Sequence, residues 1–352
     1  MSIDTLQKQQ EQKRLAYIDM AKAFALFLVI LFHKQEVQQT MLQRFGAAFH
    51  MPIFFFLFGM ASSGGAKLNT LRDGIVRRFR SMMVPYFLWA FIYLRTWKIS
   101  LTSIVFLLYG SHATIRASGT NSVLWFLPAM FFAACVFDLV TFCGAKKESN
   151  KKRAWLYTGA IAAAALLSFA VGKLIPLIPL VSKAHSPLNM DVALSGFCFL
   201  MAGYLLKDWI HKVLDKSNGV LMLLSAAFCL LTVLLARWNP VRVIMAMGVY
   251  GNFLLFLAGG LTGSIGITLL MAVFERIMKS ASRPIAWIGR HSMFIFASHH
   301  IIFNLLDQCY ELLGISQPGT MAEIVLYSIL TMALCSSCCA VTVPFAPVLE
   351  GK

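Results

Sequence analysis

The sequence predicts an all-α integral membrane protein, with about ten transmembrane helices in a single bundle and both termini in the cytoplasm. Of its 352 residues, 59% are apolar and 13% are charged, whereas soluble globular chains are about 45–50% apolar and about 25% charged. Apolar runs of roughly 20 residues, the length of a membrane-crossing helix, recur along the chain. The basic residues behind the net charge of +16 lie in short clusters between those runs. These features exclude a soluble enzyme, a disordered chain and a nucleic-acid binder.

Ten apolar segments are candidate membrane spans. The third is weak, because Pro85 lies near its start and Arg95 near its end. Residues 101–109 are apolar but too short to cross, which favours an interfacial or re-entrant piece. The segment 250–274 contains five glycines and is kept as one span, because two would be too short. The ten segments are 15–33, 46–63, 82–98, 123–143, 154–171, 190–206, 219–236, 250–274, 285–306 and 321–343.

The first apolar segment begins like a secretory signal peptide, since basic residues precede it. It is long, however, it contains Asp19 and Lys22, and no small-residue cleavage site follows it. We therefore expect a retained first span. The expected organisation is a cytoplasmic N-terminal segment over 1–14, one membrane domain over 15–345 and a short C-terminal tail over 346–352.

The distribution of basic residues orients the bundle. With ten spans, 21 of the 31 lysines and arginines lie on the side of the N-terminus, nine lie on the other side, and Lys22 lies inside the first span. Cytoplasmic loops carry the excess of lysine and arginine. The bias places both termini in the cytoplasm, and we expect a multi-pass protein of the bacterial inner membrane, with the lipid bilayer as a partner.

The cysteines indicate neither a disulfide framework nor a metal centre. Most of the eight lie inside apolar runs, where a free cysteine packs as a small hydrophobic residue. The cluster of Cys335, Cys338 and Cys339 has no partner cluster. No histidine spacing resembles a metal site either, so the sequence predicts no metal.

Three ionisable residues lie in the first span, namely Asp19, Lys22 and His33. Such groups cost about 2.5–3.5 kcal/mol at the membrane centre on insertion scales and often mark functional sites. Lys22 and His33 are eleven residues apart, which places them on one face of a helix and about 16 Å apart along its axis. Asp19 and Lys22 are three residues apart and can pair. The alternative is that the charged pair reaches the interface while His33 caps the outer end.

The next segments extend this polar face. His50 begins the second span from the outer side, at a depth similar to that of His33. Arg77 and Arg80, in the inner loop that follows, share one face if the loop is helical, and paired arginines suit phosphate groups. The alternative explanation is that these arginines only set the orientation of the chain in the membrane and contact lipid headgroups. Together these residues describe a phosphorylated donor that docks on arginines and extends past Lys22 towards a histidine able to deprotonate a hydroxyl.

Five motifs in this order resemble acyltransferase family 3, the multi-span membrane O-acyltransferases, and in particular its fucose 4-O-acetylase-like branch. The resemblance covers about residues 14–310. The motifs are Tyr17–Lys22 continuing to His33; His50–Pro52 with the phenylalanine run after it; Arg77 and Arg80 followed by Val84–Trp89; Leu124–Ala129; and Ile288–Met293 continuing to His299.

The resemblance implies an O-acetyltransferase that moves an acetyl or other acyl group from cytoplasmic acyl-CoA to a hydroxyl of a cell-surface glycan or glycolipid. It implies that His33 is the general base or acyl-handling residue, with Lys22 and Asp19 beside it in the catalytic set. Arg77 and Arg80 would bind the CoA phosphates, and acetyl-CoA would be the co-substrate.

The chain departs from the family pattern at two positions. Lys22 stands where many members have arginine, which is a mild change because this branch often has lysine. Phe58 stands where many members have serine before the glycine, which puts a role for that serine in doubt here.

Three further residues are candidate substrate contacts, and the first two have a structural alternative. Trp125 would stack on a sugar or belong to the aromatic belt at the interface. Asp191 would bind sugar hydroxyls or cap the sixth span. His299 is favoured over His300 only by the family motif. His50 completes the expected substrate-binding set.

Two rival functions remain at this stage. A transporter or flippase for a lipid-linked glycan would also have charges inside the membrane and a basic inner face, but it would not need the His33 imidazole. A glycan polymerase would have large outer loops, whereas the longest outer loop here is only about 99–122.

Overall fold

The computed structural model describes residues 15–34, 40–94, 100–178 and 184–352. Over these residues the chain is helical, and the one β-type contact is an isolated bridge between Ile244 and Val249. The segment expected over 1–14 and the end of the third apolar segment, with Arg95 and Lys98, lie outside the described residues.

Every candidate apolar segment coincides with a helix or a pair of helices. Three shorter helices, α5 (Leu71–Arg78), α7 (Leu101–Tyr109) and α8 (His112–Ala117), lie between them. The helix α7 covers the piece predicted to be too short to cross. The main helices are α2 (Ala16–Phe32), α3 (Met41–Phe49) with α4 (Pro52–Ala61), α6 (Val84–Tyr93), α9 (Phe126–Ala145), α10 (Asn150–Leu174), α11 (Met190–Leu214), α12 (Asn218–Trp238), α13 (Phe253–Ile277), α14 (Lys279–Arg290) with α15 (Ser292–Leu312), and α16 (Met321–Thr342).

Seven helical stretches in the described residues are long and apolar enough to cross a membrane. The helices α2, α6 and α15 are not among them, since α2 has 17 residues, α6 has ten, and α15 contains adjacent histidines and two acidic residues. A multi-pass membrane protein is therefore confirmed, while ten spans and cytoplasmic termini stay predictions. The seven stretches are Met41–Ala61, Ser122–Ala145, Asn150–Leu174, Pro187–Leu214, Asn218–Trp238, Phe253–Ile277 and Met321–Thr342.

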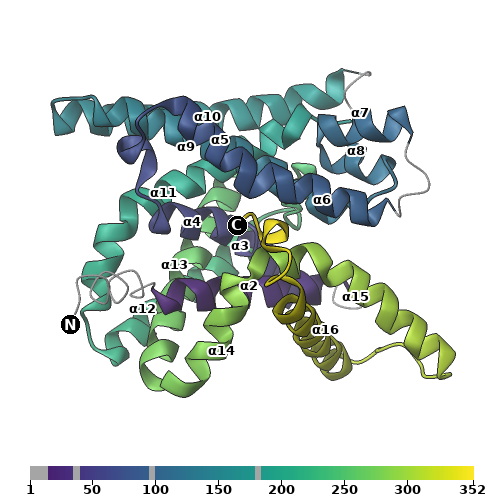
Figure 1. Cartoon of the computed structure of the whole chain (residues 1–352). Helices are drawn as coiled ribbons and strands as arrows, with labels where there is room; N and C mark the ends of the chain where they lie inside the picture. The colour runs from purple at the N-terminus through teal and green to yellow at the C-terminus, as the bar shows by residue number, and fades with distance from the viewer. Residues whose placement is uncertain (1–14, 35–39, 95–99, 179–183) are drawn as a thin grey trace, which may run out of the picture.

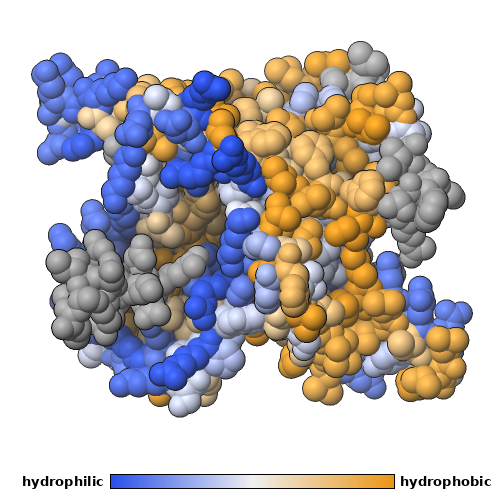
Figure 2. All heavy atoms as spheres, viewed as in Figure 1, coloured by the Kyte–Doolittle hydropathy of each residue, from blue (hydrophilic) through white to orange (hydrophobic). Residues whose placement is uncertain are grey.

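The helix α2 lies at the centre of the molecule (Figure 1). It packs against α4, α13, α14, α15 and α16, and twelve of its 17 residues are buried. The helices α10 and α12 lie at the periphery instead, with only 17% and 22% of their most apolar stretches buried inside the protein. Figure 2 shows apolar side chains over α6, α15 and α16 and hydrophilic ones around α5 and α14. The polar residues of α2 are thus held by protein, while the outer helices offer apolar faces to lipid.

Glycines bring several helix backbones into direct contact. A Cβ atom on Gly289 of α14 would lie 1.7 Å from the carbonyl oxygen of Asp19 on α2. Between α4 and α11 the contact is reciprocal, because a Cβ on Gly59 would lie 1.9 Å from the oxygen of Leu200 and one on Gly203 would lie 2.0 Å from that of Phe56. Small residues at such crossings are typical of membrane bundles. Here they fix how α2 sits against α14.

The C-terminal segment is packed against the bundle. It forms a short 3₁₀ turn over Pro347–Glu350, and the indole nitrogen of Trp89 donates to the carbonyl oxygen of Leu349 at 3.1 Å. The Glu350 carboxylate is buried, 2.7 Å from Nδ1 of His291 and 2.7 Å from Nζ of Lys352. The residues expected to form a short tail therefore line part of the interior.

Candidate active site

The helix α2 carries polar groups at both of its ends. Nζ of Lys22 lies 3.0 Å from Oδ1 of Asp19, whose side chain is only 3% exposed. This is the pair that the three-residue spacing predicts. His33 caps the other end of the helix. It lies eleven residues after Lys22, which is about 16 Å along the axis. Each end faces a different pocket.

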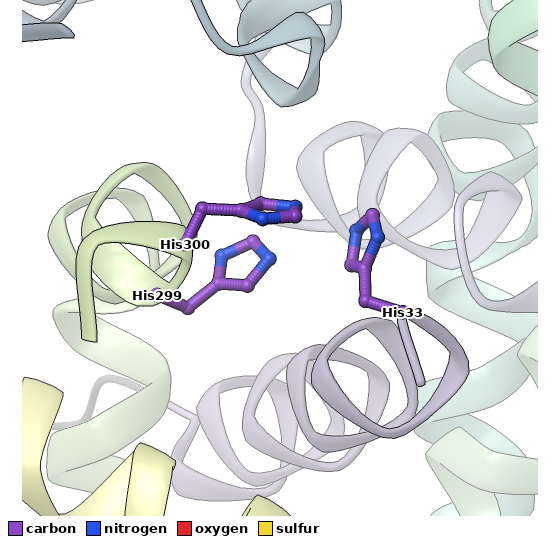
Figure 3. Close-up of side chains that lie close together, drawn as sticks. All are labelled: His33, His299 and His300. Carbon is purple, nitrogen blue, oxygen red and sulfur yellow. The ribbon is translucent and has the colours of Figure 1, made fainter. Parts of the chain in front are cut away.

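Three histidines meet beside the end of α2 (Figure 3). The ring centre of His33 lies 5.1 Å from that of His299 and 4.5 Å from that of His300, and the latter two are 4.6 Å apart. Sequence reasoning favoured His299 alone. Both adjacent rings reach His33 because it lies past the last turn of α2, beside the face of α15 that they share.

His299 is held by its own helix. It is completely buried, and its Nδ1 lies 2.6 Å from the carbonyl oxygen of Phe296. Since a carbonyl oxygen only accepts hydrogen bonds, Nδ1 carries the proton in a neutral ring and Nε2 is left as an acceptor. This Nε2 is buried and has no hydrogen-bond partner in the described residues, so it is available to a donor that enters the cluster.

We call the cavity next to these rings the histidine pocket. It has a volume of about 210 Å³ and is lined by residues of α2, α3, α8 and α15 and of the segments around Trp125 and Met245. His50 lines it, with Nδ1 held 3.0 Å from the oxygen of Gly46. Arg242 lines it as well, and its Nη1 donates to Oε1 of Gln43 at 2.6 Å. Imidazole and guanidinium groups that line a pocket are suited to binding hydroxyl groups.

The structure separates the remaining substrate candidates. Trp125 is 5% exposed and lines the histidine pocket, a position that does not fit an aromatic belt facing lipid. Asp191 does not line this pocket. Its carboxylate accepts a hydrogen bond from the Ser186 hydroxyl, and its own backbone N–H donates to that hydroxyl at 3.0 Å. The helix N–H is thus accepted by Ser186, and Asp191 is an acidic residue in the first turn of α11 rather than its capping group.

His112 belongs to this site although none of the five sequence motifs contains it. It begins α8 and lines the histidine pocket. Burial, together with the nearby His185 and Arg116, lowers the pKa of His112 to about 4, so its ring is neutral at pH 7. No periodic pattern in the sequence points to this placement, because residues 100–122 form short helices joined by turns.

A second cavity, the cationic pocket, lies at the Lys22 end of α2. It has a volume of about 400 Å³. Lys22, Arg78, Arg290 and Lys352 bring four cationic side chains to its lining, and Glu350 brings one carboxylate. The other lining residues are mostly apolar, namely Phe54, Phe58, Ala61, Met82, Phe126, Leu127, Met130, Met293 and Phe296, with Ser81, Gly289 and Ser292.

The arginines predicted to bind phosphates lie next to this pocket rather than in it. Arg77 and Arg80 line a surface hollow of about 560 Å³, which we call the arginine hollow, and Ser81 lines both the hollow and the cationic pocket. The arginine that faces the pocket is Arg78. It donates two hydrogen bonds to the buried carboxylate of Asp138, at 2.9 and 3.0 Å.

Two groups of side chains in the described residues bring three possible metal ligands within 4.8 Å of one another. His291, Cys339 and Glu350 form one group, but its carboxylate is already paired with His291 and with a lysine. His33, His299 and His300 form the other, and neutral imidazoles are common ligands of Zn²⁺ and Ni²⁺. Linear spacing could not reveal either group, because each combines distant segments.

Comparison with known proteins assigns the chain to a family. A search of curated proteins finds no match. The family model described as an acyltransferase domain matches residues 15–340, nearly the whole of the bundle that holds the two pockets. The chain therefore belongs to the acyltransferase 3 family and is a membrane acyltransferase.

Proposed function

We propose that this protein moves an acetyl or other short acyl group from cytoplasmic acyl-CoA to a hydroxyl of a cell-surface glycan or glycolipid. The observation that supports this most directly is the arrangement around α2. One end of the helix faces a pocket rich in cations, and the other faces a cluster of histidines. Within an acyltransferase family, these two pockets suit an anionic donor and a hydroxyl acceptor. The fucose 4-O-acetylase-like branch and the bacterial inner membrane belong to the same proposal.

We assign the donor to the cationic pocket and the arginine hollow. CoA carries phosphates at one end and a thioester on an uncharged arm at the other. Arg77 and Arg80 are exposed in the hollow, where both can bind phosphates, and Nη2 of Arg77 also lies 3.9 Å from Oδ2 of Asp138. The arm would then pass Ser81 into a pocket with an apolar lining. Lys22 extends the cationic surface inwards, and Asp19 positions its ammonium group.

We assign the acceptor to the histidine pocket. Trp125 offers an indole face to a sugar ring, and His50, His112 and Arg242 offer polar groups to its hydroxyls. His33 removes the proton from the attacking hydroxyl. The hydroxyl oxygen forms a bond to the acyl carbon, the carbon–sulfur bond breaks, and the proton leaves with CoA as the thiol. General-base catalysis of this kind contributes about 10²–10⁴-fold to a rate.

A transporter or flippase for a lipid-linked glycan is the rival reading. Its charged residues would serve equally well, but it would have no use for a histidine with an available acceptor nitrogen beside His33. The family match also favours the enzyme. The rival predicts that glycan export depends on the protein while acylation does not.

The test compares glycan acetylation in cells that carry the wild type, His33→Ala, Lys22→Ala or the control His211→Ala at matched membrane levels. His211 is exposed in the last turn of α11 and lines neither pocket. Ester-linked acetate on the surface glycan is read by mass spectrometry before and after mild base. Loss of acetate in the first two variants only, with glycan still exported, supports the transferase. Acetate that never depends on the protein, with export that does, overturns it.

A further inference from the structure

The histidine pocket and the cationic pocket share one lining residue among those the structure describes, Phe296 of α15. Its side chain is 5% exposed, and it precedes His299 by one helical turn. The position is therefore at the boundary between the two cavities. A substrate group that passes from one cavity to the other must pass this ring.

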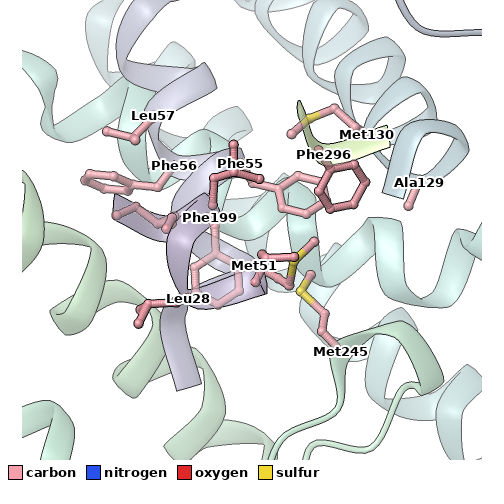
Figure 4. Close-up of a cluster of buried hydrophobic side chains, with 14 of the residues drawn as sticks. Leu28, Met51, Phe55, Phe56, Leu57, Ala129, Met130, Phe199, Met245 and Phe296 are labelled. Atoms are coloured by element: carbon pink, nitrogen blue, oxygen red, sulfur yellow. The ribbon is translucent and has the colours of Figure 1, made fainter. Parts of the chain in front are cut away.

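The neighbours of Phe296 form an apolar layer (Figure 4). Its ring centre lies 5.5 Å from that of Phe126, which lines the cationic pocket, and 6.0 Å from that of His299. The ring of Phe126 in turn packs against Phe55, with ring centres 5.3 Å apart. Met130 lines the layer on the cationic side. Met51 and Met245 line it on the histidine side. Phenylalanine and methionine form an apolar barrier that a short acyl chain enters more readily than water does.

We propose that Phe296 sets the size of the acyl group that reaches His33, and so determines donor specificity. This inference rests on the proposed function. The thioester carbon must come within about 3–3.5 Å of the attacking oxygen for transfer, and His33 and Lys22 are about 16 Å apart along α2. The acyl end of a donor held in the cationic pocket therefore has to cross the layer. A phenyl ring at the crossing leaves room for a small group and obstructs a long one.

The same ring separates the thioester from the wetter pocket when no acceptor is bound. Water that reached an activated acyl group would hydrolyse it, and excluding water from a site suppresses such side reactions. Substitution of Phe296 by a smaller residue therefore has two consequences. Longer acyl groups gain access to His33, and hydrolysis of acyl-CoA in the absence of transfer increases.

The experiment uses inverted membrane vesicles that contain the full-length protein and its native glycan. Acetyl-, butyryl- and octanoyl-CoA labelled in the acyl group are compared, with base-labile label on the glycan read as transfer and free acid read as hydrolysis. The variants are Phe296→Ala, Phe296→Leu and the control Phe294→Ala. Phe294 is equally buried on the same helix, packs against Trp89 and lines neither pocket.

We expect Phe296→Ala to raise the ratio of octanoyl to acetyl transfer about tenfold or more and to increase hydrolysis of acyl-CoA. Phe296→Leu should change the ratio in the same direction but by less. Phe294→Ala should leave the ratio unchanged. Leucine keeps most of the apolar volume, so it tests the inference even if alanine prevents folding. Unchanged ratios in active Phe296 variants overturn this inference alone. No transfer or hydrolysis of any acyl-CoA by the wild type overturns the proposed function and the inference with it.

Discussion

Nδ1 of His299 lies 2.6 Å from the carbonyl oxygen of Phe296, one turn earlier on the same helix. This bond fixes the ring and leaves its other nitrogen as an acceptor directed into the cluster with His33. A base that must hold a precise position benefits from a neighbour that accepts its N–H. We therefore assign His299 as a positioning residue for His33.

The role of His299 predicts how kinetic constants change. We expect His299→Ala to lower kcat about 100-fold, because a misplaced reacting group costs about that much, while KM for acyl-CoA stays the same. Steady-state kinetics in vesicles measures both, and thermal stability of the purified variant serves as the check on folding. A purely structural role would lower the amount of active protein without changing either constant of the remainder.

The three imidazoles also predict sensitivity to transition metals. Their ligand nitrogens lie within 4.8 Å of one another, and rotation of the side chains would bring them to the roughly 3.3 Å that separates ligands in a tetrahedral site. We expect added Zn²⁺ or Ni²⁺ to inhibit transfer by occupying the His33 lone pair, and EDTA to restore it. His300→Ala keeps His33 and should raise the inhibitory concentration at least tenfold. Equal inhibition of this variant and the wild type would place the effect elsewhere.

Arg77 and Arg80 are expected to act on donor binding alone. The double variant Arg77→Ala/Arg80→Ala should raise KM for acyl-CoA about 10–100-fold, since each lost charged contact to a phosphate costs about 1.5–3 kcal/mol less the screening at an exposed site. The rate at saturating donor should stay near that of the wild type. Lys151→Ala/Lys152→Ala removes the same charge from exposed positions at the start of α10 and should leave KM unaltered.

Asp138 is expected to be structural. Its carboxylate is 3% exposed and receives two hydrogen bonds from Arg78, whose side chain is 12% exposed. Removal of one partner of a buried pair costs about 3–5 kcal/mol. We expect Asp138→Ala to melt at a clearly lower temperature in detergent, with the exposed Asp208→Ala as control. A melting temperature within a degree of the wild type would show that the pair contributes little.

Much of the fold follows from apolar segment lengths, because each of the ten predicted segments contains a helix. The pair of Asp19 and Lys22 and the pocket position of His33 also follow from helical spacing. Spacing fails where the contact joins distant segments. Tertiary packing brings His300 to His33, His112 to the histidine pocket and Arg78 to the cationic pocket, and a single sequence does not encode such packing in any local period.

Arg78, rather than the predicted Arg77, faces the cationic pocket, and a helical wheel alone could not predict this. Arg77 and Arg78 end the regular helix α5, whereas Arg80 lies in the π-helical turn over Phe79–Met83 that follows, so the regular helical spacing that relates Arg77 to Arg80 does not hold across this junction. Asp138 on α9 then draws in the arginine that faces it. Neither the turn nor the partner is visible in the spacing of the arginines.

The contact between Gly289 and Asp19 bears on how a mutational scan of this protein should be interpreted. Gly289 has no functional group, yet a single methyl at this position would overlap the main chain that carries the Lys22 pair. The displaced helix would deform the cationic pocket, which Gly289 also lines. A screen for activity would therefore identify Gly289 as essential alongside the residues proposed to act in the reaction. The loss of activity in a Gly289 variant would instead arise from an increased distance between α2 and α14.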